Sequence, residues 1–222
     1  MNPFFKKHHL EIKTAEDYLL TVIKNILADN TTPENKMVEH IASRIKTLDS
    51  ITEKLTTKGL EVTEDNAIEH LSDIIGVRLV VHFISDIYRV RNMIVDSGKL
   101  QIIREKDYVK QPKPSGYRSY HIVLEVPMND VTVRAEIQLR TVAMDCWASL
   151  EHQIRYKKNI PNINIIHKEL KKCSDDLMSA DITMEQIKHA VCDAEGIDKD
   201  IPDIAKGFVV PDVELEELEG LA

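Results

Sequence analysis

The chain has 222 residues, of which 43% are hydrophobic and 30% charged, enough to build a folded core with a charged surface. It contains no run of 18 apolar residues and no apolar segment behind its first basic residues, so we expect neither a transmembrane helix nor a secretory signal. Its three cysteines are too few and too far apart for a disulfide framework or a zinc site, which favours a cytoplasmic protein.

Charge is distributed unevenly along the chain. Residues 173–222 have a net charge of −11, so the overall net charge of −8 leaves +3 for the preceding 172 residues. Within these, residues 99–120 hold six basic side chains against two acidic ones. A local basic surface of this size favours a small polyanion such as a nucleotide over long nucleic acid.

Two helices are predicted at the N-terminal end. Apolar residues at helical spacing predict the first over residues 13–30. Pro33, which suits a first helical position, predicts that a second helix follows. The inner face of this second helix is expected to contain Val38, Ile41, Ile45 and Leu48.

A third helix is expected to begin at Ser50, because Ser50 and Glu53 match a capping box. The free backbone N–H groups at such a helix start bind phosphate oxygens well. Three basic residues surround this point: Arg44, Lys46 and Lys54. They indicate either a phosphate site or a solvated basic helix face, and this segment alone does not decide between the two.

Four segments are predicted to be strands because they are rich in β-branched residues or alternate in polarity: residues 76–83, 100–108, 120–126 and 131–141. A short helix over residues 67–71 and a longer one over residues 85–97 flank the first strand. Two prolines and a glycine predict a stiff, charged loop over residues 111–118. The last two strands are expected to form a hairpin.

The strand at residues 131–141 has one apolar and one polar face. On the polar face, Glu136 and Gln138 lie between two arginines, Arg134 and Arg140. This pattern fits a binding site, but the exposed faces of antiparallel sheets also carry mixed charges. Within the first strand, Arg78 needs a partner for its charge, and a purely structural ion pair would supply one.

A further helix is predicted from Thr141 to Lys157 or Lys158, where Pro161 breaks it. Its inward residues are expected to be Trp147, Leu150 and Ile154.

Over residues 163–191 apolar residues step alternately by three and four, which is the spacing of a coiled-coil seam. This helix needs a partner, either the body of the chain or a second copy. Residues 196–222 end in an acidic run and predict a tail with little fixed structure. Four strands with segregated helices predict an α+β fold with a mixed sheet.

The common phosphate-binding loops are missing, since neither a Walker sequence nor a Gly-x-Gly-x-x-Gly motif occurs. Two isolated acids remain near strand ends among many basic residues, Asp73 and Glu136. Two carboxylates together with phosphate oxygens are ligands that Mg²⁺ prefers, and surrounding cations favour phosphoryl transfer. Tyr117, on the stiff loop, suits stacking on a base.

Three ordered motifs in the second half of the chain resemble the synthetase domain of the RelA/SpoT family. They read KPSGYRSYH at residues 113–121, EIQLRT at residues 136–141 and WASLEH at residues 147–152. The upstream stretches Arg44–Lys54 and Asp73–Arg78 match as well, so the resemblance covers about residues 35–160. Because no hydrolase motif and no C-terminal regulatory region are recognised, the chain is similar to the stand-alone small alarmone synthetases.

The resemblance implies a nucleotidyltransferase-like fold and transfer of the β,γ-pyrophosphate of ATP to the 3′-hydroxyl of GDP or GTP, which yields (p)ppGpp and AMP. It implies that Asp73 and Glu136 hold Mg²⁺ and that Glu136 deprotonates the hydroxyl. It implies that Arg44 and Arg78 flank the adenine and that Tyr117 stacks on the guanine. The residues implied for ATP are Arg44, Lys46, Ser50, Lys54, Arg78, Arg104 and Lys106. The residues implied for GDP or GTP are Lys113, Ser115, Tyr117, His121, Gln138 and Arg140, with Glu151 in support.

The expected organisation is an N-terminal helix over residues 1–33, a synthetase domain over residues 34–160, an oligomerisation helix over residues 161–195 and an acidic tail over residues 196–222. Small synthetases of this type form ring-like homotetramers through terminal helices, which implies a homotetramer here. Two alternatives stay open, a catalytically inactive nucleotide-binding regulator and an RNA-binding protein of the same fold. The second requires a wider basic surface than a charge of +3 supplies.

Overall fold

The computed structural model describes residues 4–32, 36–129, 131–155 and 163–194. The elements in chain order are α1 (His9–Asn30), β1 (Val38–Ile45), α2 (Leu48–Thr57), α3 (Glu64–His70), β2 (Ile75–Val81), α4 (Ile84–Asp96), β3 (Gln101–Asp107), β4 (Tyr120–Pro127), β5 (Thr132–Thr141), α5 (Val142–Arg155) and α6 (Ile163–Ala194). The predicted helix break at Pro161 and the predicted tail over residues 196–222 lie outside the described residues.

One five-stranded sheet forms the centre of the molecule, with the strand order β1-β2-β5-β4-β3. Three of its four strand pairs are antiparallel, and β2 with β5 is the parallel pair. The predicted mixed α+β fold is therefore confirmed. A parallel pair needs a long connection, and here the chain between β2 and β5 supplies α4, β3 and β4.

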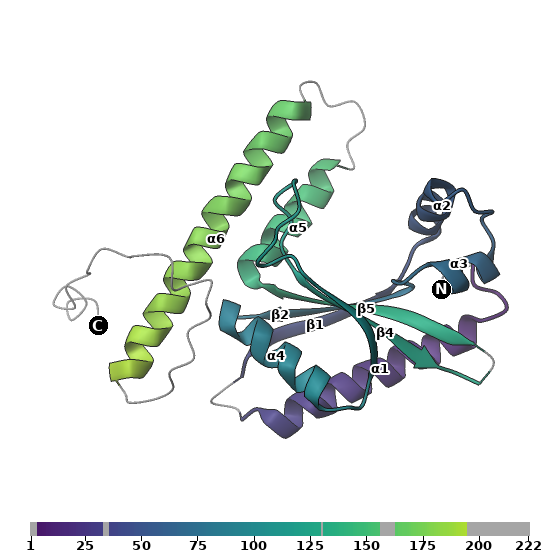
Figure 1. Ribbon diagram of the computed structural model, residues 1–222, viewed down its shortest axis with the longest axis horizontal. Coiled ribbons are helices and arrows are strands. Elements are labelled where there is room, and N and C mark those ends of the chain that lie inside the picture. The colour runs from purple at the N-terminus through teal and green to yellow at the C-terminus, as the bar shows by residue number, and fades with distance from the viewer. Residues whose placement is uncertain (1–3, 33–35, 130, 156–162, 195–222) are drawn as a thin grey trace.

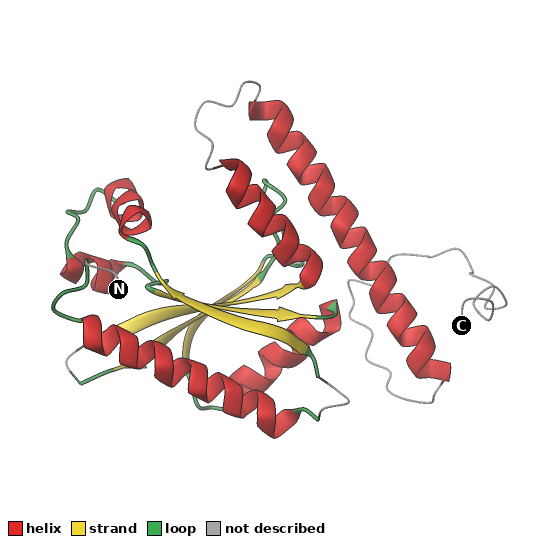
Figure 2. Ribbon diagram, turned by 180° about the vertical axis from the view of Figure 1, so that it is seen from behind, coloured by secondary structure: helices red, strands yellow, loops and turns green. Residues whose placement is uncertain are grey.

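The helices cover the sheet unevenly. Figure 1 shows α1 and α4 against one face, whereas α2 and α5 rise from the opposite face at its two ends; the view from behind in Figure 2 agrees. The apolar side of β5 lies in the covered layer, because Val133, Ala135, Ile137 and Leu139 are fully buried. Its polar side therefore faces the space between α2 and α5. None of the described helices is long and apolar enough to cross a lipid bilayer.

The prediction of a second N-terminal helix is wrong, because residues 38–45 form strand β1. This strand pairs with β2 along most of its length, and the register shifts between Val38 and His40. The shift interrupts the alternation of side chains, so Val38, Ile41 and Ile45 fall at a spacing that imitates a helix. Backbone pairing with an already buried strand outweighs this local pattern.

The start of α2 differs by a few residues from the prediction. Thr47 is the N-cap, and its hydroxyl accepts a hydrogen bond from the Ser50 N–H at 3.4 Å. Ser50 therefore lies in the first turn of α2 and is not its cap. Both residues suit the capping role, and Thr47 takes it because β1 has already ended at Ile45. Gly59 follows the helix with a φ of 71°, as expected for a glycine stop.

Helix α6 presents a different face to the body than its heptad pattern suggests. The buried side consists of Ser174, Met178, Ile182, Glu185 and His189, each at most 9% exposed. Of the predicted apolar seam, Leu170 and Leu177 are partly buried, whereas Met184, Ile187 and Val191 are each more than half exposed. In α5, Trp147 is buried as predicted, but the prediction for Leu150 is wrong because this residue is exposed.

The packing of α1 against the sheet predicts that two leucines of this helix differ in their contribution to the free energy of unfolding. Leu19 is fully buried against the core, whereas Leu10 is 75% exposed. Leu19→Ala should lower the free energy of unfolding by about 2–5 kcal/mol, and Leu10→Ala by less than about 0.5 kcal/mol. Urea unfolding monitored by circular dichroism measures both, and equal losses would contradict the assigned packing of α1.

Candidate active site

The register of the sheet places polar side chains in rows on its open face. Arg78 of β2 lies opposite Gln138 of β5, which lies opposite His121 of β4, which lies opposite Lys106 of β3. One row earlier, Glu136 lies beside Gly76, a position without a side chain. Side chains that are far apart in sequence therefore share one surface.

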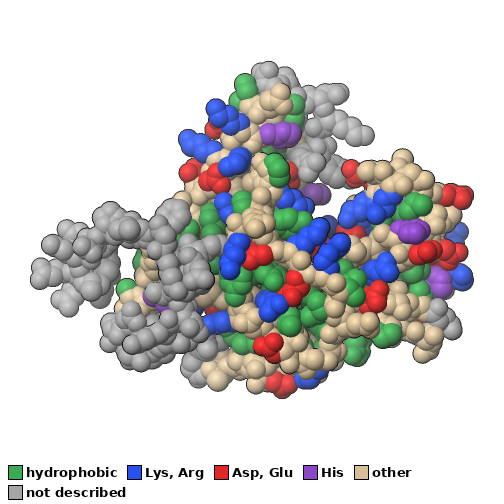
Figure 3. Space-filling model, in the orientation of Figure 1, with side chains coloured by type: hydrophobic (Ala, Val, Ile, Leu, Met, Phe, Trp, Pro, Cys, Tyr) green, Lys and Arg blue, Asp and Glu red, His purple; other side chains and the backbone are tan. Residues whose placement is uncertain are grey.

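Two adjoining cavities lie on this face, of about 220 and 640 Å³. The larger one extends from the open face of the sheet to α5, and Figure 3 shows Lys and Arg side chains gathered around a hollow on this side. The sequence-predicted residues that line it are Arg44, Lys46, Lys54, Asp73, Arg78, Arg104, Lys106, Lys113, Ser115, Tyr117, His121, Glu136, Gln138 and Arg140, and Glu151 lines it too. Ser50 lines neither cavity.

Asp73, just before β2, is the carboxylate at the α2 end of the site. Its Oδ2 accepts hydrogen bonds from Lys46 at 2.7 Å and from Lys54 at 2.6 Å. Burial opposes ionisation of Asp73, yet the two ammonium groups keep its pKa below the usual value. Burial lowers the pKa of Lys46 in turn. The second oxygen of Asp73, Oδ1, is buried and has no hydrogen-bond partner among the described residues.

Glu136, in the middle of β5, is the second carboxylate of the site. His121 Nδ1 lies 3.1 Å from its Oε2, and Gln138 donates to its Oε1 at 2.7 Å. Burial alone would raise the pKa of Glu136, but His121, with smaller contributions from Gln138 and Lys54, lowers it to about 2. Glu136 is therefore a carboxylate throughout the physiological pH range.

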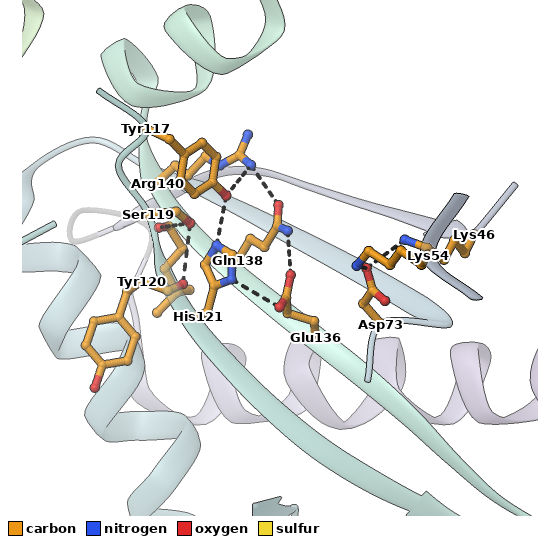
Figure 4. A network of polar contacts seen from close by, with 11 residues as sticks. Lys46, Lys54, Asp73, Tyr117, Ser119, Tyr120, His121, Glu136, Gln138 and Arg140 are labelled. Atoms are coloured by element: carbon orange, nitrogen blue, oxygen red, sulfur yellow. Dashed lines mark hydrogen bonds and ion pairs between the residues drawn. The ribbon is translucent and has the colours of Figure 1, made fainter. Parts of the chain in front are cut away.

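Glu136, Gln138 and His121 belong to a closed ring of five hydrogen-bonded residues, shown in Figure 4. Arg140 donates to Gln138 Oε1 at 2.7 Å and to the Tyr117 hydroxyl at 2.9 Å. The Tyr117 hydroxyl lies 2.8 Å from His121 Nε2, which completes the ring through His121 to Glu136. A proton on His121 Nδ1 lets it donate to Glu136, and an unprotonated Nε2 lets it accept from the Tyr117 hydroxyl, so these contacts are consistent with one another.

The loop before β4 brings aromatic side chains to the same place. Tyr108, Tyr117 and His121 are in edge-to-face contact with one another. The ammonium of Lys113 lies 4.8 Å from the centre of the Tyr117 ring, and the guanidinium of Arg140 lies 5.2 Å from it. A base that stacks on Tyr117 therefore has to displace one of these cations from the ring or lie in contact with it.

Asp145, in the first turn of α5, is a site residue that the sequence prediction missed. Its Oδ1 lies 2.9 Å from Arg140 Nη1 and 3.2 Å from Arg78 Nη1. One carboxylate thus joins two arginines from different ends of the site. An acid five residues after Arg140, at the start of a helix, was the available signal. Tyr108, at the end of β3, was missed as well.

The donor set fits a hard divalent cation when phosphate oxygens complete its coordination. Asp73 and Glu136 line both cavities, and Asp73 Oδ1 is the unpaired, buried oxygen. The described residues contain no cluster of three or more His, Cys, Asp or Glu side chains that could hold a metal alone. Mg²⁺ is usually bound by one or two carboxylates together with nucleotide phosphates, which matches this arrangement.

Comparison with known proteins places this geometry in a family. The profile described as "Region found in RelA / SpoT proteins" matches residues 43–161. GTP pyrophosphokinase YwaC of Bacillus subtilis is 42% identical over 192 residues, which is 84% of this chain and 91% of the relative. GTP pyrophosphokinase YjbM of the same organism is 34% identical and covers 73% of this chain and 77% of its own length.

Solved structures agree with the sequence comparisons. Small alarmone synthetase 2 from Bacillus subtilis covers 84% of this chain and 99% of its own, at 40% identity and a TM-score of 0.72. Small alarmone synthetase 1 from the same organism, bound to its product pppGpp, covers 81% and 94% at 32% identity and a TM-score of 0.72. Fold and site thus define a nucleotide-binding synthetase domain. The chain belongs to the RelA/SpoT family.

The low pKa of Glu136 makes a prediction about acid stability. A carboxylate whose pKa is lower in the folded than in the unfolded state stabilises the fold above its unfolded pKa of about 4.5, and this contribution is lost as the pH falls towards about 2. The difference in unfolding free energy between wild type and Glu136→Gln should be constant above pH 4.5 and shrink below it. Urea titrations at several pH values measure this difference, and a difference that grows on acidification would contradict the assigned environment.

Proposed function

We propose a division of roles among the site residues for the reaction that this enzyme catalyses, the synthesis of (p)ppGpp from ATP and GDP or GTP. The acceptor 3′-oxygen forms a bond to the β-phosphorus of ATP. The bond from that phosphorus to the oxygen bridging the α- and β-phosphates breaks, and AMP leaves. The hydroxyl proton goes to Glu136. The observation that carries this proposal is that Asp73 and Glu136 line one cavity, among side chains that are otherwise mostly cationic or neutral.

The α2 end of the site is proposed to bind ATP. Arg44 lies opposite Gly76 on the neighbouring strand, and Arg78 follows Gly76 by two residues. Both line the smaller cavity, so two planar guanidiniums are available to stack on the adenine. Lys46 and Lys54 already hold one carboxylate oxygen and are placed to bind phosphates beside it. Arg104 and Lys106 of β3 supply further positive charge. Ser50, in the first turn of α2, remains a predicted phosphate contact.

The β4–β5 side of the site is proposed to bind the acceptor nucleotide. Lys113, Ser115 and His121 would contact its phosphates, and Tyr117 would stack on the guanine. In the ring described above, the pKa of Glu136 is too low for an efficient base. An acceptor that separates His121 from Glu136 would remove the main interaction that lowers this pKa, and would make Glu136 more basic when the hydroxyl arrives.

Mg²⁺ is the proposed cofactor, held by Asp73 Oδ1 and by Glu136. When bound, it supplies positive charge that stabilises the phosphoryl oxygens during transfer. The chain prepares for this by keeping both carboxylates ionised, since their pKa values lie below the usual range. Lys46 and Lys54 hold Asp73 in place through its other oxygen.

Replacement of the proposed base tests the assignment. Glu136→Gln keeps the size of the side chain but removes the proton acceptor, so the rate of (p)ppGpp formation should fall by about 10²–10⁴-fold. Thin-layer chromatography with γ-labelled ATP and GDP measures this rate. Glu125→Gln is the matched control, because Glu125 lies on the same face of the sheet in an ion pair with Arg134 and outside both cavities. A Glu136→Gln enzyme as fast as wild type would refute the role.

A homotetramer is proposed on separate grounds. The apolar seam of α6 is exposed at Met184, Ile187 and Val191, and a helix with apolar residues at this spacing packs against another copy.

A cytoplasmic location is proposed as well. It is supported by the exposed free thiols of Cys146 and Cys173 and by the nucleotide substrates.

Charges in this seam should break the assembly. The double variant Met184→Asp/Ile187→Asp is expected to reduce the mass measured by light scattering after size exclusion from that of a tetramer to that of a smaller species. Lys172→Asp changes an exposed position of the same helix outside the seam and should leave the mass of the assembly unchanged. A wild-type protein that elutes as a monomer would contradict the tetramer.

A further inference from the structure

The loop between β3 and β4 holds the side chains proposed to bind the acceptor nucleotide. Within it, Gly116 N–H donates to Lys113 O at 2.8 Å, and Lys113 N–H donates to Tyr117 O at 3.1 Å, so the loop forms a closed turn. The turn itself, at residues 113–117, does not fix its position relative to the sheet. Besides the bonds of Tyr117 to His121 and Arg140, contacts with α6 hold it there, although α6 lines neither cavity.

The first contact joins Gly116 to Ser174. The Ser174 hydroxyl is buried and donates to Gly116 O at 2.5 Å. Gly116 has a φ of 93°, and a Cβ added to it would lie 2.9 Å from Ser174 Cβ and 3.2 Å from Lys171 Cα. Only glycine fits here, because both the backbone angle and the close approach of α6 exclude a side chain.

The second contact joins Arg118 to Asp175. Arg118 Nη2 donates to Asp175 Oδ1 at 3.1 Å, and Arg118 Nη1 donates to Val109 O at 3.1 Å. One guanidinium therefore ties the start of the loop, its end and α6 together. Lys171, one turn earlier on α6, donates to the other oxygen of Asp175 at 2.7 Å and orients this carboxylate.

The two contacts hold the residues on either side of Tyr117, the residue whose hydroxyl enters the ring with His121 and Glu136. Helix α6 is itself fixed at several points. Trp147 donates to Leu170 O at 2.7 Å, and Glu185 accepts from the N–H of Ser85 at the start of α4 at 2.9 Å. The loop is thus held against a helix that is anchored to α5 and to α4.

From this arrangement we propose that Ser174 and Asp175 are positioning residues for the acceptor nucleotide. They contact no substrate, and they act by holding Gly116 and Arg118 so that Tyr117 and Lys113 face the acceptor site. This inference rests on the proposed function for the assignment of the loop to the acceptor. It adds that α6, besides its outward apolar seam, determines how well GDP or GTP binds.

Substitution of Asp175 separates this role from a general loss of stability. Asp175→Ala should raise the KM for GDP about tenfold, because a small displacement of a positioning group has a large effect, and should leave the KM for ATP within about twofold. Asp175→Glu should restore the KM for GDP, because it keeps the ion pair. Asp176→Ala is the matched control, because it removes an exposed carboxylate next to Asp175 on the same helix, and it should leave both KM values unchanged. Ser174→Ala should repeat the effect through the second contact.

Hydrogen exchange tests the contact between the loop and α6 independently of enzyme activity. In Asp175→Ala, amide exchange in residues 109–119 should become faster, while exchange in β5 stays as in wild type. Unchanged exchange in the loop, an unchanged KM for GDP or an equal rise in both KM values would overturn the proposal. A wild-type enzyme that forms no (p)ppGpp would instead contradict the proposed function, and the exchange result would still test the contact.

Discussion

The parallel pairing of β2 with β5 is the constraint on which the site depends. It places Glu136 beside Gly76 and Gln138 beside Arg78, so residues about 60 positions apart in the chain become neighbours. Asp73 precedes β2 and reaches the same cavities. Because side chains of a strand alternate between faces, a shift of one residue in this register would turn Glu136 into the core. The fully buried apolar face of β5, packed against α1 and α4, prevents such a shift.

Within this sheet arrangement, the five side chains of the ring hydrogen-bond to one another. Arg140 is 5% exposed and donates to Gln138, to the Tyr117 hydroxyl and to Asp145. A buried network of this kind is rigid as long as every member is paired, and the loss of one partner leaves the others unsatisfied. The ring therefore holds the side of the site proposed to bind the acceptor in one arrangement before substrates arrive. Under the proposed mechanism, a nucleotide that opens the ring would change the basicity of Glu136.

Asp145 gives the two halves of the site a shared partner. Arg78 lines the smaller cavity, at the end proposed to bind ATP, and Arg140 belongs to the ring, on the side proposed to bind the acceptor. Burial lowers the pKa of Arg78, and the nearby Arg140 lowers it further, while Asp145 opposes both effects. A single carboxylate thus allows two guanidiniums to lie close together without a large electrostatic cost.

Much of this arrangement could be predicted from the sequence, where local pattern and final environment agree. The strict alternation of β5 revealed both its buried and its polar face. Of the polar residues it selected, Glu136, Gln138 and Arg140 line the larger cavity, whereas Arg134 lies outside both cavities. The strand β1 could not be recognised, because its pairing with β2, and not its own pattern, determines its conformation. The inner face of α6 was missed for a related reason. Its buried side is partly polar, and contacts such as Ser174 with Gly116 depend on a fold that no local spacing encodes.

We propose that the sheet brings Asp73 and Glu136 to one divalent cation beside the nucleotide phosphates. The most direct test is the anomalous diffraction of Mn²⁺, used in place of Mg²⁺, in crystals of the protein with a non-hydrolysable ATP analogue. We expect a metal peak about 2 Å from Asp73 Oδ1, with Glu136 in the same coordination sphere. A peak bound by phosphates alone, or by other side chains with both carboxylates turned away, would contradict it.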